Sequence, residues 1–104
     1  MSVVTVTADN IEEIRNSGKI VLLDFYATWC APCKMLSPVV NQIADEHPEY
    51  LIGKVDVEEE KDLAEEFGIM GVPTLVVLKD GAEVDKGTGA KPKRKILEIL
   101  ESYK

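Results

Sequence analysis

Histidine and cysteine, which often bind zinc in proteins, are scarce in this sequence. Its 104 residues include one histidine and two cysteines. A zinc site needs about four ligands, and His47 belongs at the far end of the helix that we expect after the cysteines. The sequence therefore predicts no metal site.

Positive charge is also in short supply. Twelve lysines and arginines stand against nineteen aspartates and glutamates, which gives a formal net charge of −7 at pH 7. Proteins that bind nucleic acid carry the opposite sign, because lysine and arginine neutralise the phosphates. We therefore expect no nucleic-acid binding, and partners that are basic or neutral.

Long apolar runs are absent. The run at residues 20–23 ends at Asp24, and the run at residues 72–78 is short, whereas a membrane-spanning helix needs about 20 apolar residues. Residues 1–10 contain no lysine or arginine and no long apolar core, so we expect no signal peptide. These absences predict a cytoplasmic protein without a membrane segment. Cytoplasmic thiols stay mostly reduced, so a cysteine pair there is more often catalytic or metal-binding than structural.

The hydrophobic patterns and turn residues indicate strands that alternate with helices. Residues 20–27 are apolar on both alternations, as expected of a strand covered on both faces, and Asp80-Gly81 is a strong hairpin signal. Such an order predicts a parallel sheet with helices on both faces and a final antiparallel hairpin, in one α/β domain over residues 1–104. The strands are expected at residues 3–6, 20–27, 51–57, 74–79 and 83–86, and the helices at residues 10–18, 31–46, 58–67 and from 92 onward.

Two of these helices carry more detailed expectations. Asp9 or Asn10 is expected to cap the first helix. The helix at residues 31–46 shows one apolar side, which is expected to face the core. That side is formed by Met35, Leu36, Val39, Val40 and Ile43.

The two cysteines lie close together in the segment Trp29-Cys30-Ala31-Pro32-Cys33-Lys34. A strand before them and a helix after them place both sulfurs at a helix N-terminus, about one turn apart. Unpaired N–H groups and the helix dipole stabilise a thiolate there. Cys30 is therefore predicted to attack a disulfide, and Cys33, expected to be less exposed, to resolve the mixed disulfide. A structural disulfide is the alternative, but closing so short a loop stabilises a protein by only about 2 kcal/mol in the chain-entropy model.

The chain resembles the thioredoxin family over nearly all of its length. The resemblance rests on the Trp-Cys-Ala-Pro-Cys-Lys segment and on Val72-Pro73-Thr74, in the same order of strands and helices. The family usually has glycine where this chain has Ala31, a change that bears on redox potential and partner preference. The resemblance implies the thioredoxin fold, a central mixed five-stranded sheet flanked by four helices. Further matching positions are residues 24–27, Pro38, Lys54, Gly71, Gly81 and Gly89.

A carboxylate, Asp24, interrupts the apolar strand that leads to the cysteines. A buried carboxylate is costly unless it is paired or used, and burial raises its pKa. The resemblance implies that Asp24 accepts the proton of Cys33 during resolution, and that Lys54 pairs with Asp24 from the neighbouring strand. From the residues alone, Asp24 at a solvent-facing strand end and Lys54 extended to solvent remain alternatives.

The resemblance also implies a small apolar surface around Cys30 that binds the substrate. It makes the Val72–Pro73 peptide bond cis, with the backbone of Val72 ready to pair with an extended segment. Core packing for Trp29 and a turn or bulge role for Gly89 are the alternative interpretations. The expected surface consists of Trp29, Ala31, Pro32, Gly71, Val72, Pro73, Gly89 and Ala90.

Together these features predict an enzyme, a thioredoxin-type protein disulfide reductase that cycles between the Cys30/Cys33 dithiol and disulfide. The resemblance implies no bound cofactor beyond this redox-active disulfide, disulfide-containing protein substrates and a separate thioredoxin reductase as electron donor. We expect a monomer. The alternatives are a thioredoxin-like disulfide oxidase or isomerase, and a docking module with incidental redox activity.

Overall fold

The computed structural model describes residues 2–104 of the chain. Within this part, five strands form one mixed sheet and four helices accompany it, as the sequence predicts. The elements follow the chain as β1 (Val4–Thr5), α1 (Ile11–Arg15), β2 (Ile20–Tyr26), α2 (Ala31–Glu46), β3 (Tyr50–Asp56), α3 (Lys61–Glu66), β4 (Thr74–Lys79), β5 (Ala82–Thr88) and α4 (Lys93–Ser102).

The strand β2 lies at the centre of the sheet, whose order is β1-β3-β2-β4-β5. β3 runs parallel to β1 and β2, whereas β4 and β5 add an antiparallel part. The turn between the last two strands consists of Asp80 and Gly81, with φ angles of 54° and 83°. Glycine adopts this left-handed region freely and aspartate tolerates it, so the predicted hairpin is confirmed.

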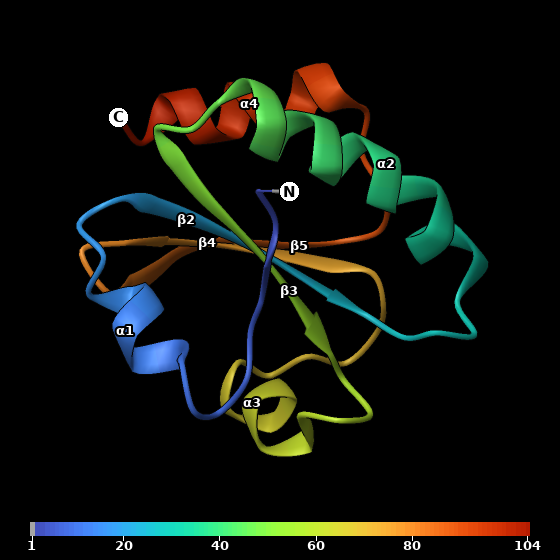
Figure 1. Cartoon of the computed structure of the whole chain (residues 1–104). Coiled ribbons are helices and arrows are strands. Elements are labelled where there is room, and N and C mark those ends of the chain that lie inside the picture. The colour runs from blue at the N-terminus through green and yellow to red at the C-terminus, as the bar shows by residue number, and fades with distance from the viewer. Residues whose placement is uncertain (1) are drawn as a thin grey trace.

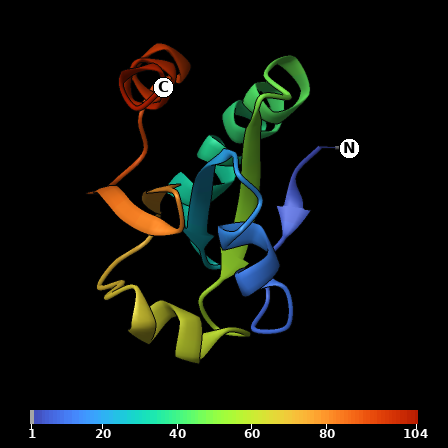
Figure 2. The same ribbon diagram turned by 90° about the vertical axis from the view of Figure 1, so that its left-hand side faces the viewer.

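Helices cover both faces of the sheet. In Figures 1 and 2, α2 and α4 lie above it, while α1 and α3 lie below. Side chains of β2 alternate between the two layers: Leu23 and Phe25 pack with α1 and α3, and Leu22 packs with α2 and α4. Because side chains two residues apart share a face, Asp24 lies on the face that α2 covers.

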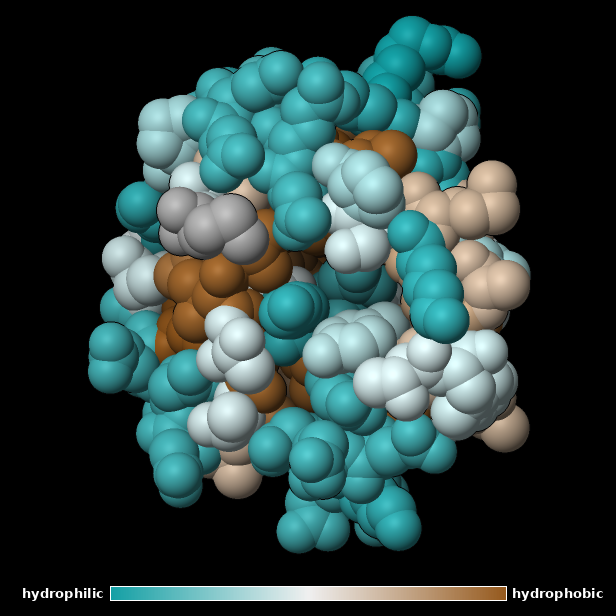
Figure 3. Space-filling view, turned by 45° about the vertical axis from the view of Figure 1, so that its right-hand side comes forward, coloured by the Kyte–Doolittle hydropathy of each residue, from teal (hydrophilic) through white to brown (hydrophobic). Residues whose placement is uncertain are grey.

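The outer surface is mainly polar. Hydrophilic residues cover most of the face shown in Figure 3, apart from an apolar area on its left half and moderately hydrophobic residues along its right side. This agrees with the excess of acidic residues in the sequence. No helix in residues 2–104 is long and apolar enough to cross a membrane.

Asn10 takes the N-cap position of α1, one of the two positions expected, but its side chain does not cap the helix. Within the described chain, the side chain of Asn10 makes no capping hydrogen bond to this helix. Its Oδ1 instead accepts the N–H of Thr7 at 2.8 Å, and its Nδ2 donates to the carbonyl of Thr5 at 2.8 Å. Asn10 therefore stabilises the turn between β1 and α1.

The helix α2 buries Leu36, Val40 and Ile43 of the predicted side and partly buries Val39, but it does not bury Met35. Met35 is 77% exposed, so its expected place against the core is wrong. It lies about 100° around the helix axis from the buried Leu36. The residues of α2 that are buried are Cys33, Leu36, Val40, Ile43 and Ala44.

Candidate active site

Cys30 and Cys33 form a disulfide at the N-terminus of α2, and their Cα atoms are 5.3 Å apart. Cys30 takes the N-cap position, and Pro32 follows in the first turn, where a residue without an N–H costs no helical hydrogen bond. The N–H of Cys33 donates to Sγ of Cys30 at 3.2 Å. The sulfur of Cys30 thus lies at the helix end that stabilises negative charge.

Both cysteines are deeply buried in this disulfide form, and each is 4% exposed. They pack with Ala27, and Tyr26 and Val72 lie against the same small cluster. The expectation that Cys33 is less exposed than Cys30 is therefore wrong for the disulfide form. What distinguishes the two sulfurs is that only Cys30 stands at the helix cap.

The loop before β4 packs against the disulfide through Val72. The Val72–Pro73 peptide bond is cis, and Pro73 is buried. The carbonyl of Pro73 accepts the N–H of Gly89 at 2.8 Å, and the hydroxyl of Thr74 donates to the carbonyl of Gly71 at 2.6 Å. The structure therefore joins two of the segments that the sequence assigns to the substrate surface.

The other members of that expected surface are open to solvent to different degrees. Ala31, Pro32 and Ala90 are exposed, and Gly89 is partly buried. Gly89 has a φ of 103°, a backbone conformation that favours glycine. The turn interpretation of Gly89 therefore holds, and it is compatible with a place in the surface.

Trp29 projects from the loop before Cys30 and is 68% exposed, which excludes the core-packing interpretation. Its Nε1–H donates to a carboxylate oxygen of Glu58 at 3.0 Å. The N–H of Glu58 in turn donates to Oδ1 of Asp56, at 2.9 Å. The turn after β3 thus fixes the indole beside Cys30. Sequence reasoning missed Glu58, because its only signal was an acidic stretch expected to begin a helix; α3 starts at Lys61 instead.

Asp24 is buried, at 4% exposure, so the alternative of a solvent-facing strand end is excluded. Within residues 2–104, no group donates a hydrogen bond to its Oδ1. Burial raises the pKa of this carboxyl from 3.8 to about 6, and the nearby positive charge of Lys54 opposes the rise to a smaller extent.

A cavity of about 320 Å³ extends from Asp24 to Cys33. Lys54 lies beside Asp24 in the pairing of β2 with β3, but it is exposed. Its ammonium group therefore acts on Asp24 as a charge at the cavity wall, in keeping with the snorkelling alternative. The residues that line the cavity are Asp24, Tyr26, Ala27, Thr28, Cys33, Lys34, Ser37 and Lys54.

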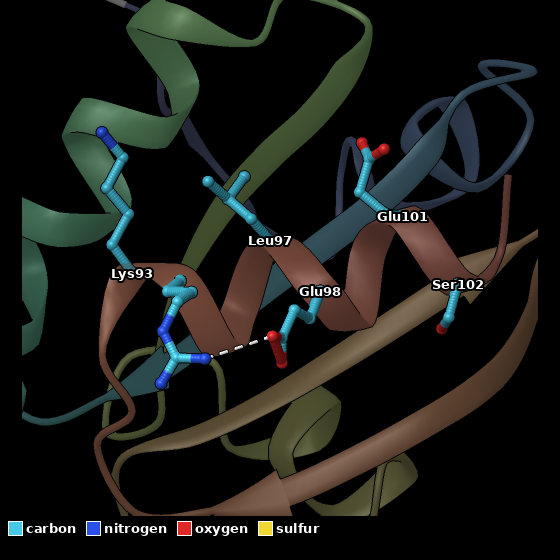
Figure 4. Close-up of a pocket in the computed structure, with 6 residues that line it drawn as sticks. Lys93, Leu97, Glu98, Glu101 and Ser102 are labelled. Carbon is cyan, nitrogen blue, oxygen red and sulfur yellow. Dashed lines mark hydrogen bonds and ion pairs between the residues drawn. The ribbon is translucent and has the colours of Figure 1, made fainter.

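A larger hollow, of about 790 Å³, lies on α4 and includes none of the expected site residues. Figure 4 shows Lys93, Leu97 and Glu101 on this helix, together with the ion pair of Arg94 and Glu98 at 3.3 Å. These charged groups face solvent and neighbouring side chains. In the part of the chain that the structure describes, no group of three or more histidine, cysteine or acidic residues is arranged to hold a metal ion. The cysteine cluster is therefore the better candidate for the site of chemistry.

Comparison with known proteins agrees with this geometry. A family model described as Thioredoxin matches residues 2–102. A thioredoxin of Staphylococcus haemolyticus is 43% identical over 104 residues, 99% of each chain, and one of Chlamydia caviae is 40% identical over 98 residues, 94% of this chain and 95% of the relative. A solved structure of a thioredoxin mutant from Halobacterium salinarum has a TM-score of 0.93 and 37% identity, covering 98% of this chain and 90% of that one.

Proposed function

The chain belongs to the thioredoxin family and is a protein disulfide reductase, and on this premise we propose how its residues divide the reaction. The observation that supports the proposal most is the N–H of Cys33, which donates to Sγ of Cys30 at the start of α2. The oxidase, isomerase and pure docking alternatives are not favoured, since full-length relatives at about 40% identity are thioredoxins.

Cys30 performs the first step. As a thiolate, its Sγ attacks one sulfur of a substrate disulfide; a bond between that sulfur and Cys30 forms, the substrate S–S bond breaks, and the second substrate sulfur leaves as a thiolate that takes a proton. The helix N-terminus stabilises the attacking thiolate. This step produces a mixed disulfide between the protein and its substrate.

Cys33 performs the second step. Its thiol gives a proton to Asp24, and its Sγ attacks Sγ of Cys30. The bond between Cys30 and the substrate sulfur breaks, and that sulfur leaves as a thiolate that takes a proton. The substrate is then fully reduced, and the protein carries the Cys30–Cys33 disulfide. A carboxyl with a pKa of about 6 is mostly ionised at pH 7 and so ready to accept a proton. The cavity that Asp24 and Cys33 share supports a transfer through water, and Lys54 at its wall favours the ionised acid.

The substrates proposed are disulfide-bearing proteins, bound as extended segments against Val72. The reducing electrons come from a separate thioredoxin reductase. We place the reaction in the cytoplasm, on a monomer in which residues 1–104 form one domain; the acidic surface argues against nucleic acid as a partner. The docking surface proposed consists of Trp29, Ala31, Pro32, Gly71, Val72, Pro73, Gly89 and Ala90.

A turnover assay with trapping tests the proposal. The wild-type protein is incubated with a small disulfide-bonded protein and dithiothreitol as electron donor. Wild type should accelerate the reduction. In a second incubation, each variant is first reduced and then freed of dithiothreitol before the substrate is added. Cys33→Ser should then accumulate a mixed disulfide that mass spectrometry detects, and Cys30→Ser should form none. Equal turnover by both variants, or a mixed disulfide on Cys33 of the Cys30→Ser variant, would contradict the assigned roles.

A further inference from the structure

Large apolar side chains are exposed at few places in the described chain, and three of the four belong to segments that contain or contact the disulfide. In residues 2–104 they are Trp29 at 68%, Met35 at 77%, Met70 at 98% and Val84 at 37%. Isolated apolar residues on a surface need no explanation, but several on the segments that surround one site indicate contact with a partner. The two methionines are not among the residues assigned to the docking surface above.

Met35 continues the surface formed by the residues between the cysteines. It follows Ala31 by four positions and Pro32 by three on α2, the spacings at which side chains of a helix are neighbours. All three are exposed, whereas Cys33 and Leu36 face inward. An apolar strip therefore runs from the helix start down one side of α2.

Met70 belongs to the loop before β4, the other segment that packs against the disulfide. It lies two residues before Val72, which packs against the cysteine cluster. The backbone around it is held in place, because the N–H of Ile69 donates to the carbonyl of Ala64 at 2.9 Å and the carbonyl of Gly71 accepts from Thr74. Ile69 packs against the core, so its neighbour Met70 extends a flexible side chain from an anchored loop.

We propose, on the basis of the reductase function above, that Met35 and Met70 are substrate contacts, and that they make the site prefer disulfides flanked by large apolar side chains. The occupant is an extended segment of a substrate protein beside its reacting cysteine. Methionine is unbranched and polarisable, so it adapts its shape to different apolar partners. Continuity with the surface around Val72 and the disulfide places these side chains where such a segment binds.

The test compares two synthetic peptides of equal length and charge, each with one intramolecular disulfide, flanked by leucine in one and by glutamine in the other. Wild type should reduce the leucine peptide with the higher kcat/KM. Met70→Gln and Met35→Gln should each lower kcat/KM for the leucine peptide by about 5- to 10-fold, the scale of burying one apolar side chain in part. Both variants should change kcat/KM for the glutamine peptide by less than about twofold. Met70→Leu should keep the higher kcat/KM for the leucine peptide.

Val84→Gln is the matched control, since Val84 is an exposed apolar residue in the half of β5 that follows the hairpin turn. The other end of this strand is Thr88, which pairs with Thr74. This variant should leave kcat/KM for both peptides unchanged. Equal losses on the two peptides, or no loss in either methionine variant, would overturn the inference while leaving the reductase function intact. Failure of wild type to reduce either peptide would contradict the reductase function itself, and this inference with it.

Discussion

Replacing Asp24 with asparagine should make the protein more stable at pH 7. The native state holds the proton of this carboxyl more tightly than the unfolded chain does, because burial raises its pKa from 3.8 to about 6. The native state therefore loses stability as pH rises from about 4 to about 6, where the buried acid must ionise. The pKa difference, at about 1.4 kcal/mol for each pKa unit, corresponds to about 3 kcal/mol at pH 7.

Asp24→Asn removes that cost, so its free energy of unfolding at pH 7 should exceed that of wild type by up to about 3 kcal/mol. At pH 4 the native acid is already protonated, and the difference should nearly vanish. Urea unfolding followed at both pH values measures the effect. Asp45→Asn, which changes an exposed acid on α2, is the control and should shift neither value by more than about 0.5 kcal/mol. Equal effects of Asp24→Asn at pH 4 and pH 7, or a loss of stability at pH 7, would refute the reasoning.

Three further predictions concern the same structure. Resolution of the mixed disulfide should slow as pH falls through about 6, because protonated Asp24 no longer accepts a proton. A rapid-quench pH profile should lose the inflection near 6 in Asp24→Asn, and the same inflection in both proteins would contradict the role. Glu58→Ala should raise KM for protein substrates about 2- to 5-fold by freeing the indole of Trp29, whereas Glu58→Gln keeps a hydrogen-bond acceptor and its KM should stay closer to that of wild type. Tryptophan fluorescence anisotropy reports the freed ring, and an unchanged anisotropy in Glu58→Ala would argue against this role of Glu58. Gly53→Ala should lower the free energy of unfolding, measured with urea, by about 1–3 kcal/mol, since the added methyl would lie 2.5 Å from a valine side chain. Gly71→Ala is the control, because its methyl would meet nothing nearer than 3.7 Å. Equal losses of stability in the two variants would argue against a packing cause.

Local sequence patterns were enough to predict the order of elements and the place of the cysteines. The strand β2 is apolar on both alternations because helices cover it on both sides, and such a pattern indicates a strand covered on both faces. Asp80-Gly81 predicts the hairpin because few residues adopt positive φ. The position of Asp24 inside the same apolar strand indicates burial, but the residues alone also allow a solvent-facing strand end, and the structure decides between the two.

Contacts between distant segments could not be predicted in this way. The hydrogen bond from Trp29 to Glu58 joins residues far apart in the chain, and periodicity does not say which loops meet. The width of a buried helix face depends on the neighbours it packs against. The apolar pattern alone does not contain that width, and it therefore predicts a place in the core for Met35. Asn10 had competing backbone partners in the preceding turn, and the sequence does not reveal which one a short polar side chain selects.

The reduction potential of the Cys30–Cys33 pair tests the central claim most directly. The protein is equilibrated in thiol–disulfide buffers of known potential, the free thiols are alkylated, and the reduced fraction is counted by mass spectrometry. A reductase of other proteins should have a potential below the cytosolic glutathione poise of about −220 to −260 mV. A potential well above that range would make the disulfide the reactive form and would contradict the account.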